Sequence, residues 1–316
     1  MNSSPAARRA FFEPWSLGDV MIAAAALREL AQPPALACHS IWHPLLRRAL
    51  EEIPQLELIS VDLPYTTRER ANPFDTGSSA NKAHPEIGEV FSIRGDYRDF
   101  AAARKIFPRA SIRMNGWVRF FGRKSGFVNL PYSLGLLPVE NRYRSWARVG
   151  GVAYATMEAS YRRRQAEAPV NRKVAIHLGA QWRSKQFPQV VDLRGALESQ
   201  GWAVTILAGP SDPLPLGLQE NEVLRVVDAR LIEELRSAEQ VVTNDSGPMH
   251  VAAFLGCRTT AVVRASPIEE WAPPATRIVR AARTPRGYRP HRRYMSDDIL
   301  TGWPAVEEIL AHLRGR

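Results

Sequence analysis

Residues 240–256 read QVVTNDSGPMHVAAFLG, and this stretch decides the fold. An apolar run ends near Thr243, a short polar turn follows, and a second apolar run begins at Met249. Pro248 suits the first turn of a helix, where its missing N–H would have no partner within the helix. The stretch therefore predicts a buried strand, a tight turn and a buried helix, which is the repeating unit of a parallel α/β sheet.

The turn within this stretch has the composition of an anion site. Asp245 or Ser246 is suited to cap the helix, and Gly247 permits close approach of a ligand. Backbone N–H groups and the positive end of the helix dipole would together suit a diphosphate. A capped helix without a ligand explains the same residues, so local physics leaves both interpretations open.

The same alternation of strand-like and helix-like segments occurs in both halves of the chain. Strands are expected at residues 10–12, 36–38, 56–61, 111–114, 174–178, 203–208, 223–227, 240–243 and 260–263. Helices are expected at residues 19–30, 44–52, 190–200, 231–237, 249–255 and 304–313. Residues 64–95 are rich in polar residues, Gly and Pro, and predict a long irregular loop.

These series predict two Rossmann-like domains. The first covers residues 1–160, residues 161–173 form a linker without apolar periodicity, and the second covers residues 174–316. Ligands of such domains lie at the carboxyl ends of the strands, so we expect a substrate cleft between the two halves. No Gly-x-Gly-x-x-Gly segment follows the first strand of either half, which argues against an oxidoreductase.

Composition indicates a globular cytoplasmic protein. The 316 residues are 45% hydrophobic and 23% charged, and no apolar run approaches the roughly 20 residues of a membrane span. The N-terminal arginines are not followed by the apolar core of a signal peptide. Cys38 and Cys257 lie in or beside apolar runs and are expected to be buried free thiols.

The net charge of +10 comes almost entirely from arginine, since the chain has only five lysines. Codon usage alone would explain such an excess. Attraction to a phosphorylated glycolipid or to anionic lipid at the inner membrane would explain it equally well. Residues 113–124 interleave aromatic residues with cations and would suit a phosphorylated saccharide or a membrane surface, or simply a half-buried face. No nucleic-acid motif accompanies the charge, so we expect no nucleic-acid partner.

Four segments, in order along the chain, resemble the ADP-heptose:lipopolysaccharide heptosyltransferases of glycosyltransferase family nine. They are SLGDV at 16–20 followed by AALR at 25–28, IHLGA at 176–180 followed by Trp182, Lys185, Phe187 and Pro188, AGPSD at 208–212, and TNDSGPMH at 243–250. The resemblance implies a GT-B fold and an inverting transfer that needs neither a metal nor a cofactor. It also implies a nucleotide-diphosphate sugar as donor, most simply ADP-heptose.

The resemblance assigns roles on the acceptor side. Asp19 corresponds to the family's proposed base, which takes the proton of the acceptor hydroxyl during attack on the anomeric carbon. Ser16 and Gly18 would shape the turn before it and contact the diphosphate. Simple helix capping is the alternative role for Asp19.

On the donor side, Lys185 would balance the charge of the leaving diphosphate, or else be a solvated loop lysine. Asp245, Ser246, Gly247 and Pro248 would bind the donor sugar and phosphate. His250 would either face the donor or pack in the core. Asp212 is the one carboxylate near the position where the family often has a ribose-binding glutamate, because that position is Pro213 here.

Two further departures from the family pattern occur. The Gly-Pro-Thr-Asp-Pro segment becomes RASPI at 264–268, and an arginine six residues before Asp19 becomes Glu13. Changes at donor-side loops bear on the nucleotide and sugar more than on the reaction type.

The sequence therefore predicts a glycosyltransferase that moves a heptose from ADP-heptose onto a lipopolysaccharide core or a related surface glycan. This would take place at the cytoplasmic face of the inner membrane. The alternatives are a GT-B enzyme that uses another nucleotide sugar, including an epimerase, and a non-catalytic scaffold that binds nucleotide sugars.

Overall fold

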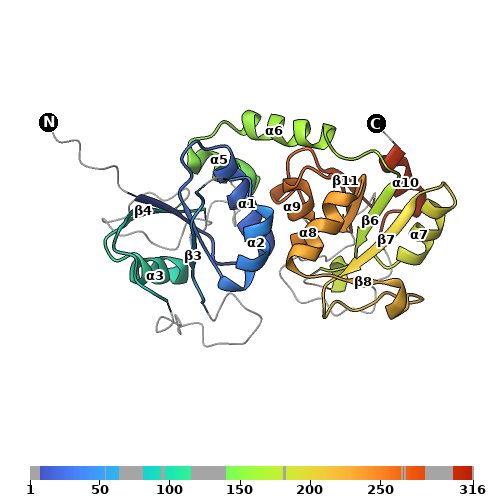
Figure 1. Ribbon diagram of the computed structural model, residues 1–316, viewed down its shortest axis with the longest axis horizontal. Coiled ribbons are helices and arrows are strands. Elements are labelled where there is room, and N and C mark those ends of the chain that lie inside the picture. Colours follow the sequence, from blue (N-terminus) through green and yellow to red (C-terminus); the bar gives the residue numbers. More distant parts are fainter. Residues whose placement is uncertain are drawn as a thin grey trace. The chain divides into compact units, whose positions relative to one another are not determined.

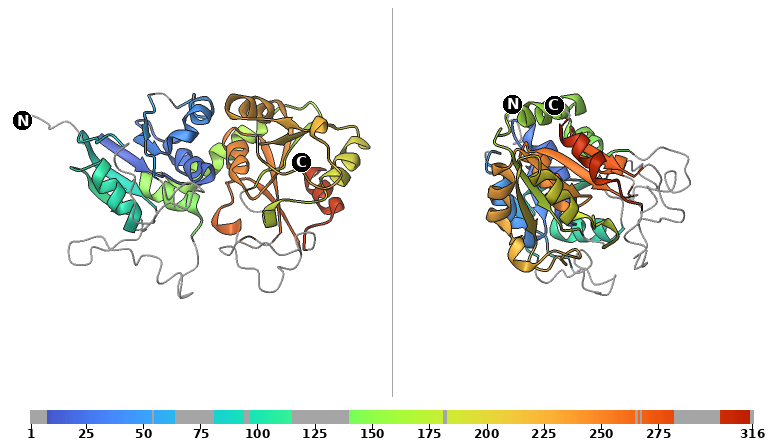
Figure 2. Two further views of the ribbon diagram at one scale, coloured as in Figure 1. Left: turned by 90° about the horizontal axis from the view of Figure 1, so that it is seen from below. Right: turned by 90° about the vertical axis from the view of Figure 1, so that its right-hand side faces the viewer.

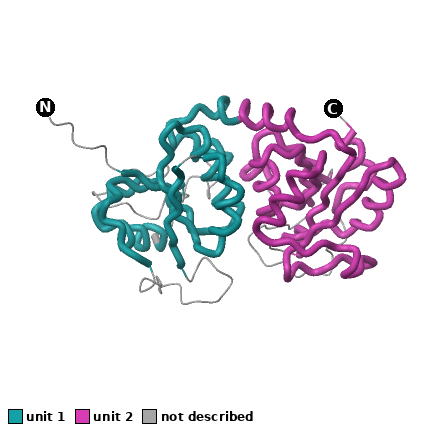
Figure 3. The backbone as a smooth tube through the Cα atoms, in the orientation of Figure 1, with its two compact units in different colours: residues 1–157 teal, residues 158–316 magenta. Residues whose placement is uncertain are grey.

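The computed structural model describes residues 8–53, 55–63, 81–93, 97–114, 140–180, 183–264, 266, 268–281 and 302–314. The chain divides into two compact units, residues 1–157 and 158–316 (Figure 3). Within the described residues each unit is built on one parallel sheet with helices on its faces (Figure 1). Residues 113–124, expected to contact a saccharide or a membrane, lie outside the described residues from 115 onward.

The first unit has the strand order β3-β2-β1-β4-β5, and all neighbouring strands run parallel. Its strands are β1 (Arg8–Phe12), β2 (Ala35–Cys38), β3 (Leu58–Ser60), β4 (Ile87–Ser92) and β5 (Ser111–Met114). Its helices are α1 (Leu17–Arg28), the 3-10 turn η1 (Ser40–Trp42), α2 (His43–Ala49), α3 (Tyr97–Ile106) and α5 (Arg142–Gly150). Helix α6 (Tyr154–Ala166) carries the chain into the second unit.

Strand β1 is buried on both faces and organises the core of the first unit. Phe12 lies in an apolar cluster with residues of α3, whereas Phe11 points to the other face and stacks on Trp146 of α5 at 4.6 Å between ring centroids. Helix α1 lies on that second face, and its alanine run at 23–26 is fully buried. Small side chains there let α5 pack closely on α1. Figure 2 shows α3, in teal, and α1, in blue, on opposite sides of this sheet.

The second unit has the strand order β11-β10-β9-β6-β7-β8, again all parallel. Its strands are β6 (Lys173–His177), β7 (Ala203–Ala208), β8 (Leu224–Arg225), β9 (Gln240–Asn244), β10 (Arg258–Val263) and β11 (Arg277–Arg280). Its α-helices are α7 (Val190–Glu198), α8 (Asp228–Ser237), α9 (Gly247–Phe254) and α10 (Val306–Arg314), and its 3-10 turns are η3 (Arg183–Lys185), η4 (Glu220–Glu222) and η5 (Ile268–Glu270).

Helices cover both faces of the second sheet. An apolar cluster joins α7 and α10 to one face through residues such as Leu193, Ile309 and Ile206. On the other face α9 contributes Met249 to a second cluster with Ala261 and packs beside α8. Figure 1 shows α8 and α9 on one side of the strands and α7 and α10 on the other. This is the layered arrangement expected of a doubly wound α/β domain.

The predicted strands and helices are confirmed with shifts of a few residues at their ends, but the irregular loop predicted for residues 64–95 is wrong at its end. Strand β4 occupies Ile87–Ser92 and pairs with β1 and β5. Gly88 and Glu89 interrupt its apolar pattern, and the Glu89 carboxylate is balanced by Arg113 of β5 at 2.7 Å. Helices α3 and α5 and strand β11 were not predicted, and residues 161–166 of the expected linker are helical.

Both cysteines are buried free thiols, as expected. Burial raises the pKa of the Cys257 thiol to about 12 and raises that of Cys38 further, so both remain protonated at neutral pH. Among the residues that the structure describes, no helix is long and apolar enough to span a bilayer.

Helix α9 is followed by a residue in the left-handed backbone conformation, which only glycine adopts without strain. Gly256 has φ +85°, its N–H donates to the Ala253 carbonyl, and the Cys257 N–H donates to the Ala252 carbonyl at 3.0 Å. This pair of bonds is a Schellman motif. A Cβ at Gly256 would lie 2.7 Å from the Cβ of Arg164.

We expect Gly256→Ala to lower the free energy of unfolding by about 1–3 kcal/mol, from left-handed strain and the clash together. Chemical denaturation would measure the change. Gly195→Ala is the matched control, because Gly195 lies inside α7 with open space around its Cβ. That substitution should stabilise the protein by roughly 0.5–1 kcal/mol, and equal effects of the two would contradict the prediction.

Candidate active site

Strand order directs attention to one place in each unit. In both sheets the chain runs outward from the first strand on one side and then crosses to the other side, which puts the switch point between β1 and β4 and between β6 and β9. Ligands of doubly wound sheets bind beyond the carboxyl ends of the strands at such a point. The segments after these strands carry most of the predicted site residues.

In the first unit, the turn after β1 presents Asp19. Ser16 is the N-cap residue of α1, and its hydroxyl donates to Asp19 Oδ2 at 2.7 Å. The Asp19 N–H lies 3.5 Å from Ser16 Oγ, so residue 16 and the third residue of the helix hold each other. The Asp19 side chain is 11% exposed. The structure thus brings Ser16 and Asp19 together, with Gly18 buried between them.

A cation beside Asp19 was not predicted. Arg142 Nη1 lies 3.9 Å from Asp19 Oδ1, at the start of α5. The sequence carries no signal for this pair, because Arg142 is far from Asp19 along the chain and follows residues without a recognised motif. The cation and the positive end of α1 both lie where they attract a negative charge on this side chain.

In the second unit, the loop after β6 and the turn after β9 meet at an ion pair. Lys185 Nζ lies 2.7 Å from Asp245 Oδ2, and the two side chains are 20% and 7% exposed. An ammonium group has three donors, so this contact fixes its position and leaves donors for a ligand. The two predicted donor residues are therefore partners of one another before any substrate arrives.

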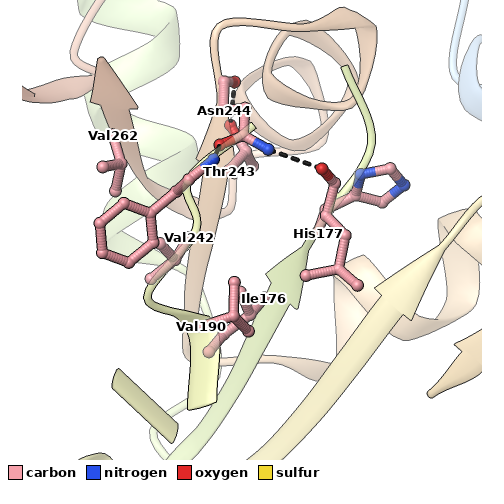
Figure 4. Close-up of a pocket in the computed structure, with 9 residues that line it drawn as sticks. Ile176, His177, Val190, Val242, Thr243, Asn244 and Val262 are labelled. Carbon is pink, nitrogen blue, oxygen red and sulfur yellow. Dashed lines mark hydrogen bonds between the residues drawn. The ribbon is translucent and has the colours of Figure 1, made fainter. Parts of the chain in front are cut away.

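Asn244 fastens the same two segments. Its Oδ1 accepts from the Phe187 N–H at 2.9 Å, and its Nδ2 donates to the Leu178 carbonyl at 2.7 Å (Figure 4). Both ends of the loop that carries Lys185 are thereby held to the last residue of β9. Asn244 was quoted within the motif but not predicted as a site residue, and its buried double contact identifies it as structural support for the loop.

The N-terminus of α9 differs in one respect from the prediction. Ser246 occupies the N-cap position, but its side chain does not cap the helix, and its hydroxyl donates to the Asn244 carbonyl at 3.4 Å. Gly247 begins the helix and Pro248 lies in its first turn. His250 is 4% exposed, which favours the core-packing interpretation over one in which it faces the donor.

Asp212 is turned inward. Its Oδ2 accepts from the Gly209 N–H at 2.7 Å, and a Cβ at Gly179 would lie 2.1 Å from that same oxygen. The Arg225 guanidinium holds the loop from outside by donating to the Gly209 and Asp212 carbonyls. Asp212 therefore supports the loops after β6 and β7, with one carboxylate oxygen occupied. Pro213 beside it is exposed.

His177 lies beneath these loops at the end of β6. Its Nδ1 accepts from the Gly179 N–H at 3.0 Å, so the neutral ring carries its proton on Nε2. Burial lowers the pKa of His177 to about 4, against the opposing charge of Asp212. A small apolar pocket below, lined by residues including Ile176, Val242 and Val262, has room for about one water molecule (Figure 4). It belongs to the core rather than to a substrate site.

Comparison with known proteins now places the chain. Residues 151–297, most of them in the second unit, match the family model of glycosyltransferase family 9 (heptosyltransferase). The matched segment is a little under half of the 316-residue chain, and over it the chain is similar to this family. The predicted family and the class of enzyme are confirmed. A comparison of the chain with curated proteins gives no match.

Solved structures show that the chain shares its fold with known heptosyltransferases. The ADP-heptose lps heptosyltransferase II of E. coli is 18% identical, with a TM-score of 0.56 over 97% of this chain and 98% of that one. E. coli heptosyltransferase WaaC with ADP is 14% identical, with a TM-score of 0.58 over 87% and 93%. WaaC with ADP-2-deoxy-2-fluoro heptose has a TM-score of 0.50 at 14% identity, over 87% and 93%. The prediction of a GT-B fold with two Rossmann-like units is confirmed.

The buried His177 should make the enzyme sensitive to mild acid. Its folded pKa of about 4 lies below its ordinary value of 6.5, so the unfolded chain binds a proton first. The neutral buried ring makes its full contribution to the free energy of unfolding above pH 6.5. This contribution, up to about 3 kcal/mol, is lost as the pH falls toward 4.

His177→Asn should retain an acceptor for the Gly179 N–H but cannot titrate. We therefore expect the stability of this variant to fall less steeply than that of the wild type between pH 6.5 and 4, as measured by denaturation at a series of pH values. Parallel curves for the two proteins would contradict a buried neutral histidine.

Proposed function

We propose that this protein transfers a heptose from ADP-heptose to a lipopolysaccharide core or a related surface glycan. The match to the family supports the reaction class. The ligands seen with E. coli WaaC, which are ADP and ADP-2-deoxy-2-fluoro heptose, support this donor for a chain of the same fold. The net positive charge and the family resemblance support a phosphate-bearing acceptor. They also support the cytoplasmic face of the inner membrane as the place where the transfer occurs.

One observation carries the donor site, namely the Lys185–Asp245 pair at the switch point between β6 and β9. The Lys185 ammonium group lies at the carboxyl end of the parallel sheet, where α9 also begins with Gly247. A diphosphate placed there would meet a positive charge and the positive end of a helix dipole. Asp245 would hold Lys185 in place, and its second oxygen would accept a hydrogen bond from a hydroxyl of the donor sugar.

The transfer itself requires a base, a leaving group and stabilisation of the charge that develops. We assign the base to Asp19, whose carboxylate would take the proton of the acceptor hydroxyl as the hydroxyl oxygen attacks the anomeric carbon. The bond from that carbon to the diphosphate breaks, and the configuration inverts. Lys185 would then balance the negative charge that remains on the departing nucleoside diphosphate.

The loop after β7, where the nucleotide would lie, departs from the family pattern. Pro213 stands where the family often has a carboxylate, and Asp212 has one oxygen engaged by the Gly209 N–H. The ribose contact expected of Asp212 would depend on its other oxygen. Another nucleotide sugar therefore remains the second candidate donor, and a scaffold that binds donors without turning them over remains the non-catalytic alternative.

Lys185→Gln should weaken ADP binding about 10- to 100-fold, because a charge-assisted contact to phosphate is lost. Calorimetry with ADP, GDP and UDP would measure the affinity and identify the preferred nucleobase in the same experiment. Lys173→Gln is the matched control, since Lys173 contacts Glu234 and Ser237 at the opposite end of β6. Equal ADP affinity in the two variants would remove Lys185 from the donor site. Preference for GDP or UDP would replace ADP-heptose as the donor.

Asp19→Asn should lower kcat for transfer from ADP-heptose by about 10²- to 10⁴-fold while leaving the affinity for ADP unchanged, because only the base is lost. A lipopolysaccharide core that lacks heptose is the acceptor for this assay. Asp192→Asn is the control, because Asp192 occupies the third position of α7 as Asp19 does in α1. Near-normal turnover of Asp19→Asn would reject the base, and ADP binding without donor consumption by the wild type would favour the scaffold.

A further inference from the structure

Trp15 stands between the end of β1 and the cap of α1, and it is held from two sides. Its carbonyl accepts a hydrogen bond from Trp42 Nε1 at 3.0 Å. Its own indole Nε1–H donates to Asp99 Oδ2, also at 3.0 Å. The guanidinium of Arg98 lies 5.8 Å from the centre of its ring.

The two partners come from the segments that follow the neighbouring strands. Trp42 ends η1, which follows β2, and Asp99 lies in the first turn of α3, which follows β4. Strands β2 and β4 flank β1 in the sheet. Trp15 therefore links three successive loops at the carboxyl edge, across the switch point of the first unit.

The link to Asp99 is a strong one. Asp99 is fully buried, and the positive end of α3 favours its charge. A hydrogen bond from an indole N–H to a buried carboxylate is charge-assisted and directional. The position of α3 is thereby transmitted to the backbone of Trp15.

Ser16 is the next residue, and its hydroxyl holds Asp19 Oδ2 at 2.7 Å. The backbone at Ser16 is extended, with φ −68° and ψ 160°, so displacement of Trp15 would move the cap and the carboxylate together. Rate depends steeply on placement, and an error of about 1 Å can cost as much as 10²-fold.

We propose that Trp15, tied to Asp99 and Trp42, is a positioning residue for sugar transfer, one that sets the place of the Ser16–Asp19 pair. The inference rests on the proposed function, in which Asp19 is the base. Trp15 is only partly buried, unlike Trp146 in the core of the same unit, so its ties to the neighbouring loops distinguish it from a residue that serves packing alone.

The first test compares two Trp→Phe variants of the full chain. Trp15→Phe keeps an aromatic ring but loses the N–H, and we expect kcat to fall about tenfold while KM for ADP-heptose and the affinity for ADP stay within about twofold. Trp146→Phe should reduce the melting temperature at least as much and leave kcat unchanged, because Trp146 stacks on Phe11 within the core. Equal kcat values for the two variants would overturn the proposal.

The second test uses rescue at the partner, which stays informative if Trp15→Phe is unstable. Asp99→Asn keeps an oxygen that accepts from the indole and should retain most of the wild-type kcat. Asp99→Leu removes the acceptor and should lower kcat about as much as Trp15→Phe. The double variant of Trp15→Phe and Asp99→Leu should be no slower than the slower single variant, because both break one contact. Equal kcat for the Asn and Leu variants, or additive losses, would contradict the link.

The outcomes separate this inference from the function on which it rests. If Asp19→Asn abolishes transfer but Trp15→Phe behaves like Trp146→Phe, only the positioning role fails. If Asp19→Asn leaves turnover intact, the assignment of the base fails, whatever Trp15 does.

Discussion

Parallel pairing of every described strand is the constraint on which the rest of this protein depends. In a parallel sheet all carboxyl ends lie at the same edge, so segments distant in sequence meet there. The reversal of strand order between β6 and β9 then separates the loops that leave these two strands. The Lys185–Asp245 contact joins these two loops. The Asn244 side chain, at the end of β9, is hydrogen-bonded to both ends of the loop that carries Lys185.

The two units use the same architecture for different chemistry. In the second unit the functional side chains converge as a cation with its carboxylate partner at the start of a helix, which is suited to a diphosphate. In the first unit the equivalent position holds a carboxylate, supported by the Ser16 hydroxyl and with Arg142 nearby, which is suited to accept a proton. In the proposed reaction the first place supplies the base and the second balances the charge of the leaving group.

Supporting contacts around both places resemble each other in kind. Polar side chains with hydrogen bonds at good distance hold the loops at both places. Asp99 secures Trp15, and Asn244 secures the loop of Lys185. Asp212 joins the loops after β6 and β7, where the absence of a side chain at Gly179 makes room for its carboxylate. Such groups are costly to bury unless they are fully paired, so each fixes a single arrangement of the loops around it.

Sequence alone determined the alternation of strands and helices, the division into two Rossmann-like series and the family, because apolar periodicity and short motifs are local properties. It also placed Asp19, Lys185 and Asp245 beyond the carboxyl ends of strands. Only the tertiary structure decided that Lys185 and Asp245 pair, that His250 is buried, that Asp212 accepts from the Gly209 N–H, and that Arg142 and Trp15 lie around the Ser16–Asp19 cap. Strand β4 was missed for the same reason, since Gly88 and Glu89 interrupt its apolar pattern and the ion pair of Glu89 with Arg113 depends on the neighbouring strand. These contacts join residues far apart in the chain, and a side chain's partner is set by sheet order and register, which no local pattern encodes.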